Sequence, residues 1–236
     1  MQTADGQLLA THPDDLAAAL EAAASSAAAA VGLRNRMRGM TLAELRAAGA
    51  DEERFPTADA LIKVFAGLLA DSGLMWREKR DPPYEDIPLL LMDLKADAFN
   101  AEAINSIMAA AQSVRATPHV ALLVSSPQQL ALVQQQTRWH GPLIKAFMDR
   151  ENPNPRVSSE DLEPFALLAP SIRMSNAFMA AASRLGKPLL SWIVDTPADL
   201  YRGLELGVNA VVSNSPLALR AVLMDWRDRC SDRQGV

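Results

Sequence analysis

The stretch KPLLSWIVDTPADLYRGLELGVNAVVSNSP, residues 187–216, predicts two short buried strands joined by one capped helix. Leu189–Val194 is an apolar run too short for a helix, and it ends where polar residues begin. Thr196, followed by proline, is typical of a helix start, and Gly207 is typical of a helix end. Asn209–Ser213 then predicts a second strand. Because two strands connected through one helix usually run parallel, this stretch favours a parallel α/β sheet.

The alternation of strands and helices continues through most of the remaining sequence. Further strands are expected at Gln7–Thr11, Leu89–Lys95, Val120–Val124, Leu143–Phe147 and Phe165–Ala169. Helices are expected after the capping-box residues Thr41 and Ser126, and at Ala17–Ala30, Ala58–Ala70, Ala101–Val114, Asn176–Leu185 and Leu217–Trp226. No glycine-rich phosphate-binding motif follows any of these strands, which weakens the Rossmann-type and P-loop alternatives. About seven strands, mostly followed by helices, therefore predict an α/β (β/α)₈ TIM barrel that occupies residues 1–236 as a single domain.

The length and composition of the chain indicate a globular protein with one sizeable core. It has 236 residues, 49% of them hydrophobic, and a formal net charge of −5. This balance gives no basic surface for nucleic acid, so we expect a small-molecule partner, while the oligomeric state stays open. The single cysteine, Cys230, excludes an internal disulfide. No segment is apolar enough to cross a bilayer, and Met1–Gly6 lacks signal-peptide features, so a cytoplasmic chain without a membrane span is expected.

The strongest candidate site residues are Asp93 and Lys95, at the end of the predicted strand LLLMDLK. Residues two apart point to the same side of a strand, and polar residues at the carboxyl ends of barrel strands commonly carry catalysis. An aspartate oxygen suits Mg²⁺ or Ca²⁺, and a nearby lysine can neutralise a phosphate. A buried Asp–Lys pair without chemistry is the alternative interpretation.

His12 is the candidate general acid or base. It follows the predicted strand QLLAT, and imidazole titrates near neutral pH. A plain loop histidine is the alternative interpretation. His119 lies at the opposite end of its strand and His140 lies in a loop, so both are expected to be structural or solvated.

Trp192 lies in the strand before the best-capped helix, with Asp195 at the end of that strand, and could supply a flat apolar wall to a substrate. A core tryptophan is the alternative interpretation. The cluster of Arg34, Arg36 and Arg38 could contact a phosphate, but a solvated arginine-rich loop is favoured. The sequence has no Cys/His cluster and no GxSxG motif, so metal-thiolate and serine-hydrolase chemistries have no support.

Four motifs of the chain together resemble the glycerophosphodiester phosphodiesterase family of (β/α)₈ barrels. TADGQLLATH, residues 3–12, is similar to the family's T-x-D-G-x-x-V-x-x-H-D segment. MTLAELRAAGADEERFPTADALI, residues 40–62, is similar to its T-L-x-E-L…P-T-L-x-E region. LLLMDLK, residues 89–95, resembles its hydrophobic-E-hydrophobic-K strand, and residues 191–216 resemble its W-T-V-N…L-G-V-D-G-I-I-T-D-x-P ending. The order and spacing of the motifs make the resemblance more specific than any one of them.

The resemblance implies a barrel that hydrolyses glycerophosphodiesters to glycerol 3-phosphate and an alcohol, with a divalent metal and two histidines. By position it implies that His12 is one catalytic histidine and that Asp93 is a ligand for Mg²⁺ or Ca²⁺. Lys95 would approach the phosphate, and Trp192 would line the substrate site. The sequence departs from the family pattern at Pro13, Asp93 and Ser213-Asn214, where the family has Asp, Glu and Thr-Asp.

The family pattern also has parts that precede the first motif of this sequence. The first strand of the family ends in His-Arg-Gly and the second carries a Glu-x-Asp metal pair, whereas this sequence begins just after both. The resemblance therefore implies a barrel without its first strand, one catalytic histidine and two metal carboxylates. Loss of one general acid or base alone costs about 10²- to 10⁴-fold in rate, so weak or absent activity is expected.

Three hypotheses about function follow. The first is a truncated form of an active phosphodiesterase, which an in-frame upstream sequence encoding His-Arg-Gly and Glu-x-Asp would support. The second is a non-catalytic relative that keeps the scaffold for binding or interaction, which metal-dependent release of glycerol 3-phosphate, abolished by His12→Ala, would exclude. The third is an unrelated barrel enzyme with Lys95 as a Schiff-base amine, which requires borohydride trapping of a carbonyl substrate on that lysine.

Overall fold

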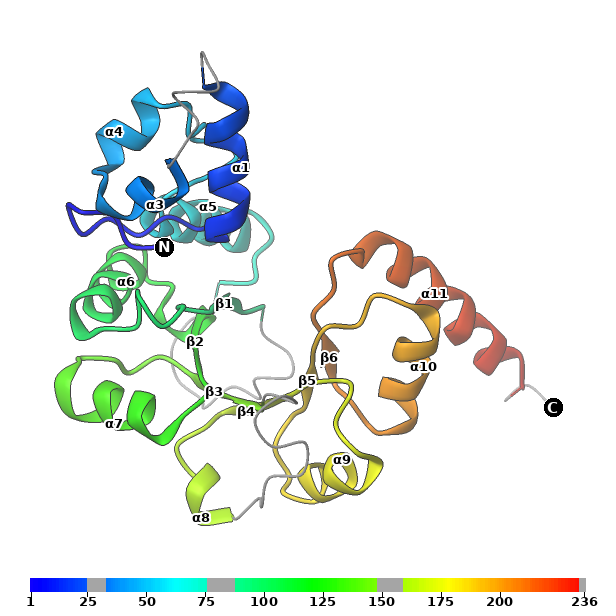
Figure 1. Cartoon of the computed structure of the whole chain (residues 1–236). Helices are drawn as coiled ribbons and strands as arrows, with labels where there is room; N and C mark the ends of the chain where they lie inside the picture. Colours follow the sequence, from blue (N-terminus) through cyan, green and yellow to red (C-terminus); the bar gives the residue numbers. More distant parts are fainter. Residues whose placement is uncertain (25–32, 76–87, 148–158, 234–236) are drawn as a thin grey trace. The chain divides into compact units, whose positions relative to one another are not determined.

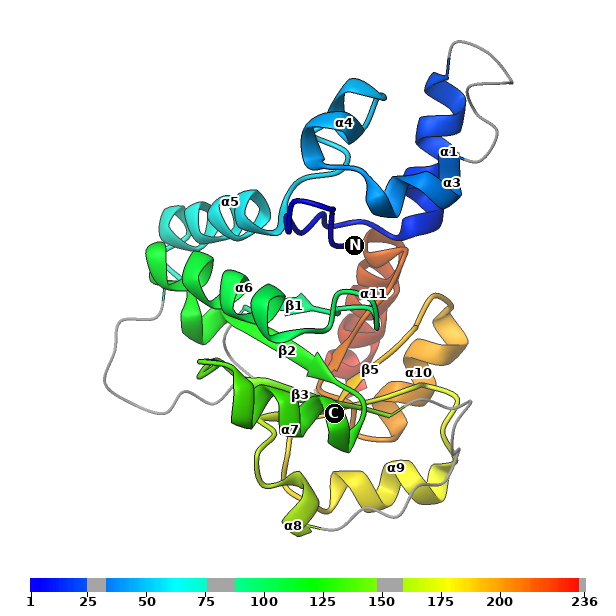
Figure 2. The ribbon, with the colours of Figure 1, turned by 60° about the vertical axis from the view of Figure 1, so that its left-hand side comes forward.

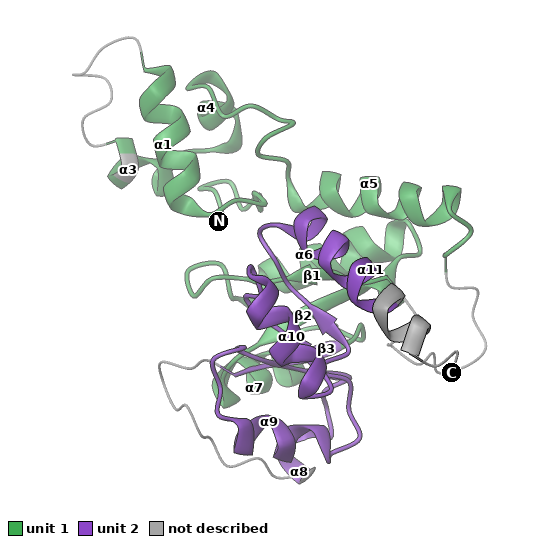
Figure 3. Ribbon diagram, turned by 90° about the vertical axis from the view of Figure 1, so that its right-hand side faces the viewer, with its two compact units in different colours: residues 1–81, 87–142 green, residues 82–86, 143–236 purple. Residues whose placement is uncertain are grey.

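A computed structural model of the chain describes residues 1–24, 33–75, 88–147 and 159–233 (Figure 1, Figure 2). The chain divides into two compact units, the first built from residues 1–81 and 87–142 and the second from residues 82–86 and 143–236 (Figure 3). Both units contain strands and helices, and the strand pairs described within each unit are parallel. The predicted α/β class is therefore confirmed, while the single domain stays a prediction.

The first unit begins with short helices around a core of their own. These are α1 (Pro13–Ala23), α3 (Leu33–Arg36), the 3₁₀ turn η1 (Met37–Gly39) and α4 (Leu42–Ala47), which lie together in Figure 1. The side chains buried between them include Leu16, Leu20, Met37, Leu45 and Phe55. Burial of these apolar side chains stabilises the group of helices. Residues 25–30 of the predicted helix Ala17–Ala30 lie outside the described residues.

Two predicted helix starts have the reciprocal hydrogen bonds of a capping box. At the start of α4, the Thr41 hydroxyl oxygen accepts from the Glu44 N–H at 3.3 Å, and the Glu44 carboxylate accepts from the Thr41 N–H at 2.8 Å. Ser126 and Gln129 make the same exchange at the start of α7 (Pro127–Gln136). Both caps satisfy backbone donors that a helix leaves without partners, so these local predictions are confirmed.

The segment Gln7–Thr11, predicted as a strand, forms isolated bridges instead. Leu8 pairs with Gln2 and Leu9 pairs with Thr57, both in antiparallel orientation. The segment thus pairs with the chain just before it and with the start of α5 (Ala58–Asp71), and it joins no parallel ladder among the described residues. The described residues accordingly contain six strands rather than the seven predicted.

Asp5 links the N-terminal turn to α4. Its Oδ1 accepts from the Thr3 hydroxyl at 2.6 Å and from the Leu42 N–H at 3.0 Å. These hydrogen bonds, that of Thr3 most strongly, lower the pKa of Asp5 because they favour the carboxylate. Gly6 completes the turn with a φ of +79°, which glycine adopts at low cost. The T-x-D-G motif therefore shapes the fold at this position.

The rest of the first unit alternates helices and strands. After α5 come β1 (Leu90–Met92), α6 (Ala101–Ser113), the 3₁₀ turn η2 (Thr117–His119), β2 (Val120–Val124) and α7. β1 and β2 are parallel, with Leu90 opposite Val120. The helical spacing correctly predicted the buried face of α6, which includes Ile104, Ile107, Met108 and Ala111. Figure 2 shows α6 lying along these two strands.

The second unit has four strands in the order β3-β4-β5-β6, each followed by a helix. The strands are β3 (Leu143–Phe147), β4 (Leu167–Pro170), β5 (Leu190–Ser191) and β6 (Ala210–Val211). The helices are α8 (Ser159–Leu162), α9 (Asn176–Ser183), α10 (Pro197–Glu205) and α11 (Pro216–Arg233). β3 pairs with β4 and β5 with β6, while parallel bridges from Leu168 to Leu189 and from Ser171 to Trp192 join β4 to β5. None of the helices in the described ranges is long and apolar enough to span a membrane.

Residues 187–216 fold into the predicted β-α-β unit. The Thr196 hydroxyl oxygen accepts from the Asp199 N–H at 3.2 Å and caps α10, and Gly207 after that helix has a φ of +74°. One buried cluster packs the unit against α11 and contains Ile172, Val194, Leu200 and Leu219. Both strands are shorter than predicted, since the paired residues of this ladder are limited to Leu190–Ser191 and Ala210–Val211.

Candidate functional site

The carboxyl end of β1 carries two of the predicted site residues. β1 stops at Met92, so Asp93 and Lys95 lie in the loop after the strand rather than within it. Lys95 Nζ lies 2.5 Å from Asp93 Oδ2, and their side chains are 51% and 54% exposed. The two side chains pair but are accessible to solvent, so the burial assumed in the alternative interpretation is wrong, while a role for the pair in chemistry stays a prediction. Exposed pairs contribute only about 0 to 1 kcal/mol, which leaves both groups able to change partner when a ligand arrives.

The same loop brings a second ion pair to this end of β1. Arg38 Nε lies 3.8 Å from Asp97 Oδ2, and Asn100 Nδ2 donates to Gln2 Oε1 at 2.7 Å. The loop therefore contacts both η1 and the N-terminal segment. Arg38, which the sequence favoured as a solvated side chain, has an acidic partner here although it is 64% exposed.

The pKa of the Met1 amino group is affected by charged side chains of both signs in this loop. It is buried and donates to the Leu9 carbonyl oxygen at 3.0 Å. Burial lowers its pKa, the Asp97 carboxylate raises it and the Lys95 ammonium lowers it. The end of β1 thus holds carboxylates that are paired with cationic side chains. A phosphate group that binds one of these cations would replace the carboxylate as its partner.

His12 lies at the N-cap position of α1 and is exposed. Its Nδ1 lies 3.8 Å from Asp14 Oδ2, and its side chain makes no capping hydrogen bond. The contacts described for His12 are within its own helix start and do not join it to Asp93 or Lys95. A catalytic role for His12 stays a prediction.

Trp192 is half-buried at the end of β5, in the second unit. Its Nε1 donates to the Ala169 carbonyl oxygen at 2.8 Å, and its backbone N–H donates to the Pro170 carbonyl oxygen at 3.3 Å. These bonds to β4 fix the orientation of the indole ring. Within the first unit, the described contacts join Asp93 to Lys95, and none of them joins His12 to that pair.

Asp195 is the most completely bonded side chain at the ends of β5 and β6. Its Oδ1 accepts from the Ser213 hydroxyl at 3.0 Å and from the Asn214 N–H at 2.7 Å, and its Oδ2 accepts from Asn214 Nδ2 at 2.8 Å. The Asn214 side chain most strongly, then the Asn214 backbone, lowers the pKa of Asp195. Sequence reasoning noted Asp195 only as a strand end. The polar pair at the end of the next strand was the signal that could have revealed its partners.

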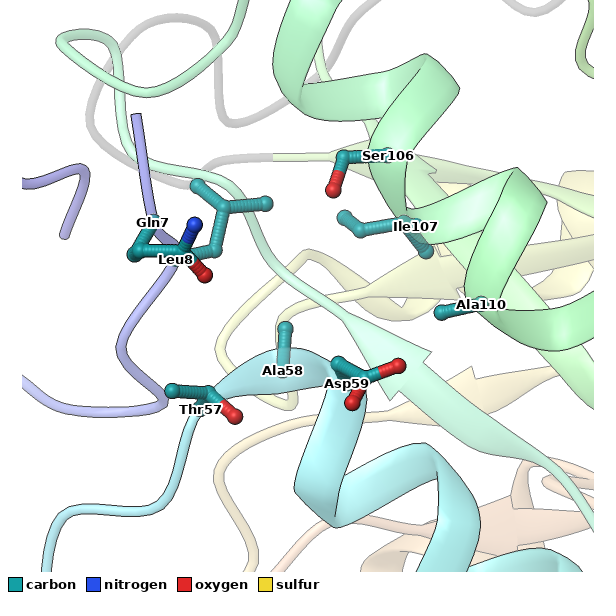
Figure 4. A pocket seen from close by; sticks show the side chains of 8 residues that line it. All are labelled: Gln7, Leu8, Thr57, Ala58, Asp59, Ser106, Ile107 and Ala110. Atoms are coloured by element: carbon teal, nitrogen blue, oxygen red, sulfur yellow. The ribbon is translucent and has the colours of Figure 1, made fainter. Parts of the chain in front are cut away.

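A small pocket lies between the N-terminal segment, the start of α5 and α6 (Figure 4). Its volume of about 20 Å³ has room for a water molecule and not for a glycerophosphodiester. The lining residues include Gln7, Asp59 and Ser106, and none of the predicted site residues. Asp59 is already paired with Lys63 at 2.8 Å. The pocket is therefore not the candidate substrate site.

The residues at the end of β1 do not fit a metal centre of several carboxylates. Within the described ranges, no three His, Cys, Asp or Glu side chains gather closely enough to hold a metal ion. Asp93 instead has the Lys95 ammonium as its partner, and an ammonium competes with a cation for the same oxygen. A Mg²⁺ or Ca²⁺ ion at Asp93 would first have to displace Lys95.

The two remaining histidines have the structural or solvated surroundings that were expected. His119 is fully buried, and its Nδ1 lies 3.0 Å from the Pro88 carbonyl oxygen. His140 is exposed, with its Nδ1 3.1 Å from the Arg138 carbonyl oxygen. Neither contacts a predicted site residue through the interactions described for it.

Sequence comparisons give no relative for this chain. It matches no protein-family model, and no curated protein matches its sequence. Whatever the fold shares with known proteins must therefore be found in the structure.

Several solved structures that match this chain are named as glycerophosphodiester phosphodiesterases. A protein from Galdieria sulphuraria assigned to this activity matches 95% of this chain and 83% of its own, with a TM-score of 0.66 and 15% identity. An Oleispira antarctica phosphodiesterase in complex with the product sn-glycerol-3-phosphate matches 79% of this chain and 72% of its own, with a TM-score of 0.57 and 16% identity. A glycerophosphodiester phosphodiesterase from Parabacteroides distasonis matches 81% and 74%, with a TM-score of 0.56 and 13% identity. The chain thus shares the TIM-barrel type of α/β fold with these structures, although its described residues hold six strands rather than the eight of a complete barrel.

Proposed function

We propose that the chain is a phosphoric diester hydrolase of the glycerophosphodiester phosphodiesterase type, with weak activity. The observation that supports this most is the likeness of the fold over 95% of the chain. The Oleispira antarctica phosphodiesterase, which shares the fold, holds sn-glycerol-3-phosphate. A small glycerophosphodiester is accordingly the substrate we propose, and glycerol 3-phosphate and an alcohol are the products.

Lys95 is the proposed phosphate-binding residue. Its ammonium is half exposed at the carboxyl end of a parallel strand, where barrel enzymes commonly place their chemistry. A phosphodiester carries one negative charge, so it can replace the Asp93 carboxylate as the partner of the ammonium. The exchange costs little, because an exposed pair is weak.

His12 is the proposed general acid or base. Hydrolysis breaks the bond between phosphorus and the alcohol oxygen, and the leaving oxygen must gain a proton while the attacking water loses one. An exposed imidazole can perform either transfer near neutral pH. Among the predicted site residues, the one histidine His12 would have to serve both transfers, which is why the proposed activity is weak.

Asp93 is the residue of this chain that would hold a divalent metal. When bound, Mg²⁺ or Ca²⁺ would neutralise charge on the phosphate. The pairing of Asp93 with Lys95 and its single carboxylate oppose such binding. The proposed metal affinity is therefore low.

A non-catalytic relative that binds a phosphate-bearing molecule is the second candidate function. It is favoured because the contacts described for His12 lie within its own helix start, and no group of three possible metal ligands is found among the described residues. The Schiff-base alternative loses its basis, because Lys95 lies in an exposed loop beside a carboxylate and not in an apolar strand.

The test is release of glycerol 3-phosphate by the purified chain from glycerophosphodiesters with neutral and cationic alcohols. We expect slow release that His12→Ala lowers by about 10²- to 10⁴-fold. His140→Ala is the matched control, because His140 is also exposed but is bonded only within its own loop. This control is expected to retain the wild-type rate.

Calorimetric titration with glycerol 3-phosphate separates the two candidate functions. Binding without any turnover would favour the non-catalytic relative. Absence of both binding and turnover would reject both candidates.

A further inference from the structure

The ends of β5 and β6 are tied together beyond their short ladder by Asp195, Ser213 and Asn214, here named the Asp195 clasp. All three hydrogen bonds of the clasp end on one carboxylate, at 2.7 to 3.0 Å. One donor is a backbone N–H, which keeps its place whatever rotamers the side chains adopt. The clasp therefore fixes the chain at the end of β6 and not merely two side chains.

The clasp also orders the loop that leads into α11. The Ser213 hydroxyl oxygen accepts from the Ser215 N–H at 2.9 Å while the same hydroxyl donates to Asp195. Pro216 then begins α11, and Leu219 in its first turns is buried with Val194 and Leu200. The Asp195 carboxylate thus helps to fix the backbone conformation of the loop between β6 and α11.

The opposite side of the same segment is held by β4. The Ile172 N–H donates to the Trp192 carbonyl oxygen at 2.8 Å, and Trp192 Nε1 donates to Ala169. The Val194 N–H donates to the Val212 carbonyl oxygen at 2.9 Å, on the side of β6. The four residues from Trp192 to Asp195 are therefore fixed to β4 at one end and to the β6 loop at the other.

Asp195 already uses three of the about four acceptor positions of its carboxylate within the clasp. Both of its oxygens already accept hydrogen bonds, and these bonds favour the charged carboxylate. A proton or a metal ion bound by this carboxylate would compete with the donors of the clasp. Its contribution is thus expected through geometry.

We propose that Asp195 is a positioning residue that holds the segment following Trp192, the residue that the resemblance places at the substrate site, and that Asp195 and Asn214 form an exchangeable acid–amide pair. This inference rests on the proposed function for its effect on turnover. In the exchanged variant Asp195→Asn/Asn214→Asp, the new amide oxygen can accept from Ser213 and from the backbone N–H, and the new amide N–H₂ can donate to the new carboxylate. In Asn214→Asp alone, two carboxylates face each other at hydrogen-bond distance and repel.

The test compares these variants by turnover and by the ¹⁹F resonance of Trp192 in 5-fluorotryptophan-labelled protein, assigned through its loss in Trp192→Phe. Asn214→Asp is expected to shift or broaden this resonance and to lower kcat/KM by up to about 10²-fold, the cost of a misplaced contact. The exchanged variant is expected to restore both. Asn209→Asp is the matched control, because it adds a carboxylate beside β6 while keeping the oxygen that accepts from the Leu189 N–H at 2.9 Å. Asp195→Asn keeps one accepting oxygen and is expected to act more mildly than Asn214→Asp.

The outcomes separate this inference from the proposed function. An unchanged Trp192 resonance in Asn214→Asp, or a resonance that the exchange does not restore, would overturn the inference even in an active enzyme. If the wild-type chain shows no turnover but the resonance is lost and restored as expected, the clasp is supported and the proposed function fails.

Discussion

Asp93 and Asp195 are both exposed aspartates that follow a strand in the described part of the chain, and they are held in different ways. Asp93, after β1, has the ammonium of a flexible lysine as its partner. Asp195, after β5, accepts three hydrogen bonds, one of them from the backbone. The comparison shows two different roles. The Asp93–Lys95 pair can open so that Lys95 binds a ligand, whereas Asp195 stabilises the fold. Position at the carboxyl end of a strand, taken alone, does not distinguish them.

The largest expected effect is on stability, and it concerns the buried apolar cluster next to Asp195. Leu200→Ala removes a buried side chain from the cluster that also contains Val194 and Leu219, and should lower the free energy of unfolding by about 2 to 5 kcal/mol. Urea unfolding measures this. Leu204→Ala on the same helix is the control with a smaller expected loss, because Leu204 is only partly buried. Equal losses of unfolding free energy in the two variants would show that the buried cluster does not stabilise the segment that carries Asp195.

The next effect concerns the end of β1. Lys95→Ala removes the proposed phosphate-binding ammonium and should lower kcat/KM by about 10²- to 10³-fold. Lys63→Ala is the matched control, since Lys63 is equally exposed and lies 2.8 Å from Asp59 in a comparable pair. Equal rates in the two variants would remove Lys95 from the proposed site.

A smaller effect is expected from the partner of that lysine. Asp93→Asn removes the carboxylate that competes for Lys95, so glycerol 3-phosphate should bind up to about fivefold more tightly when no metal is added. Calorimetric titration measures the change in Kd. Weaker binding in this variant would mean that Asp93 itself helps to hold the ligand.

The smallest effect is the response of the Asp195 clasp to acid. The folded pKa of Asp195 lies below its ordinary value of 3.8, so its stabilising contribution is complete above that value and is lost as pH falls through the lowered pKa. In Asp195→Asn this contribution should be missing at every pH. The difference in melting temperature between wild type and variant should therefore narrow below about pH 4. A difference independent of pH would argue that the carboxylate charge is irrelevant.

Local signals in the sequence predicted much of this fold. The capping boxes at Thr41 and Ser126, the buried face of α6 and the helix start at Thr196 depend on neighbours within one or two turns. The spacing of Asp93 and Lys95 placed both within a strand, whereas they lie in the exposed loop after β1, where they pair.

Long-range contacts could not be predicted from one sequence. Asp195 meets Asn214 across 19 residues, and Arg38 meets Asp97 across a still longer separation. No periodicity encodes such pairs, because they depend on how elements pack. The early end of β1 and the bridges of Gln7–Thr11 were missed for the same reason, since pairing in a sheet is decided by the partner segment.

The most direct test of the account is to map where sn-glycerol-3-phosphate binds, by amide chemical shifts of the whole isotope-labelled chain. The account predicts perturbed amides in the loop of residues 93–100, and their loss in Lys95→Ala. It predicts no direct perturbation of residues 213–215, whose donors already bond to Asp195 or to the Ser213 hydroxyl oxygen. Perturbation confined to residues 213–215, with the loop after β1 unaffected, would contradict the account.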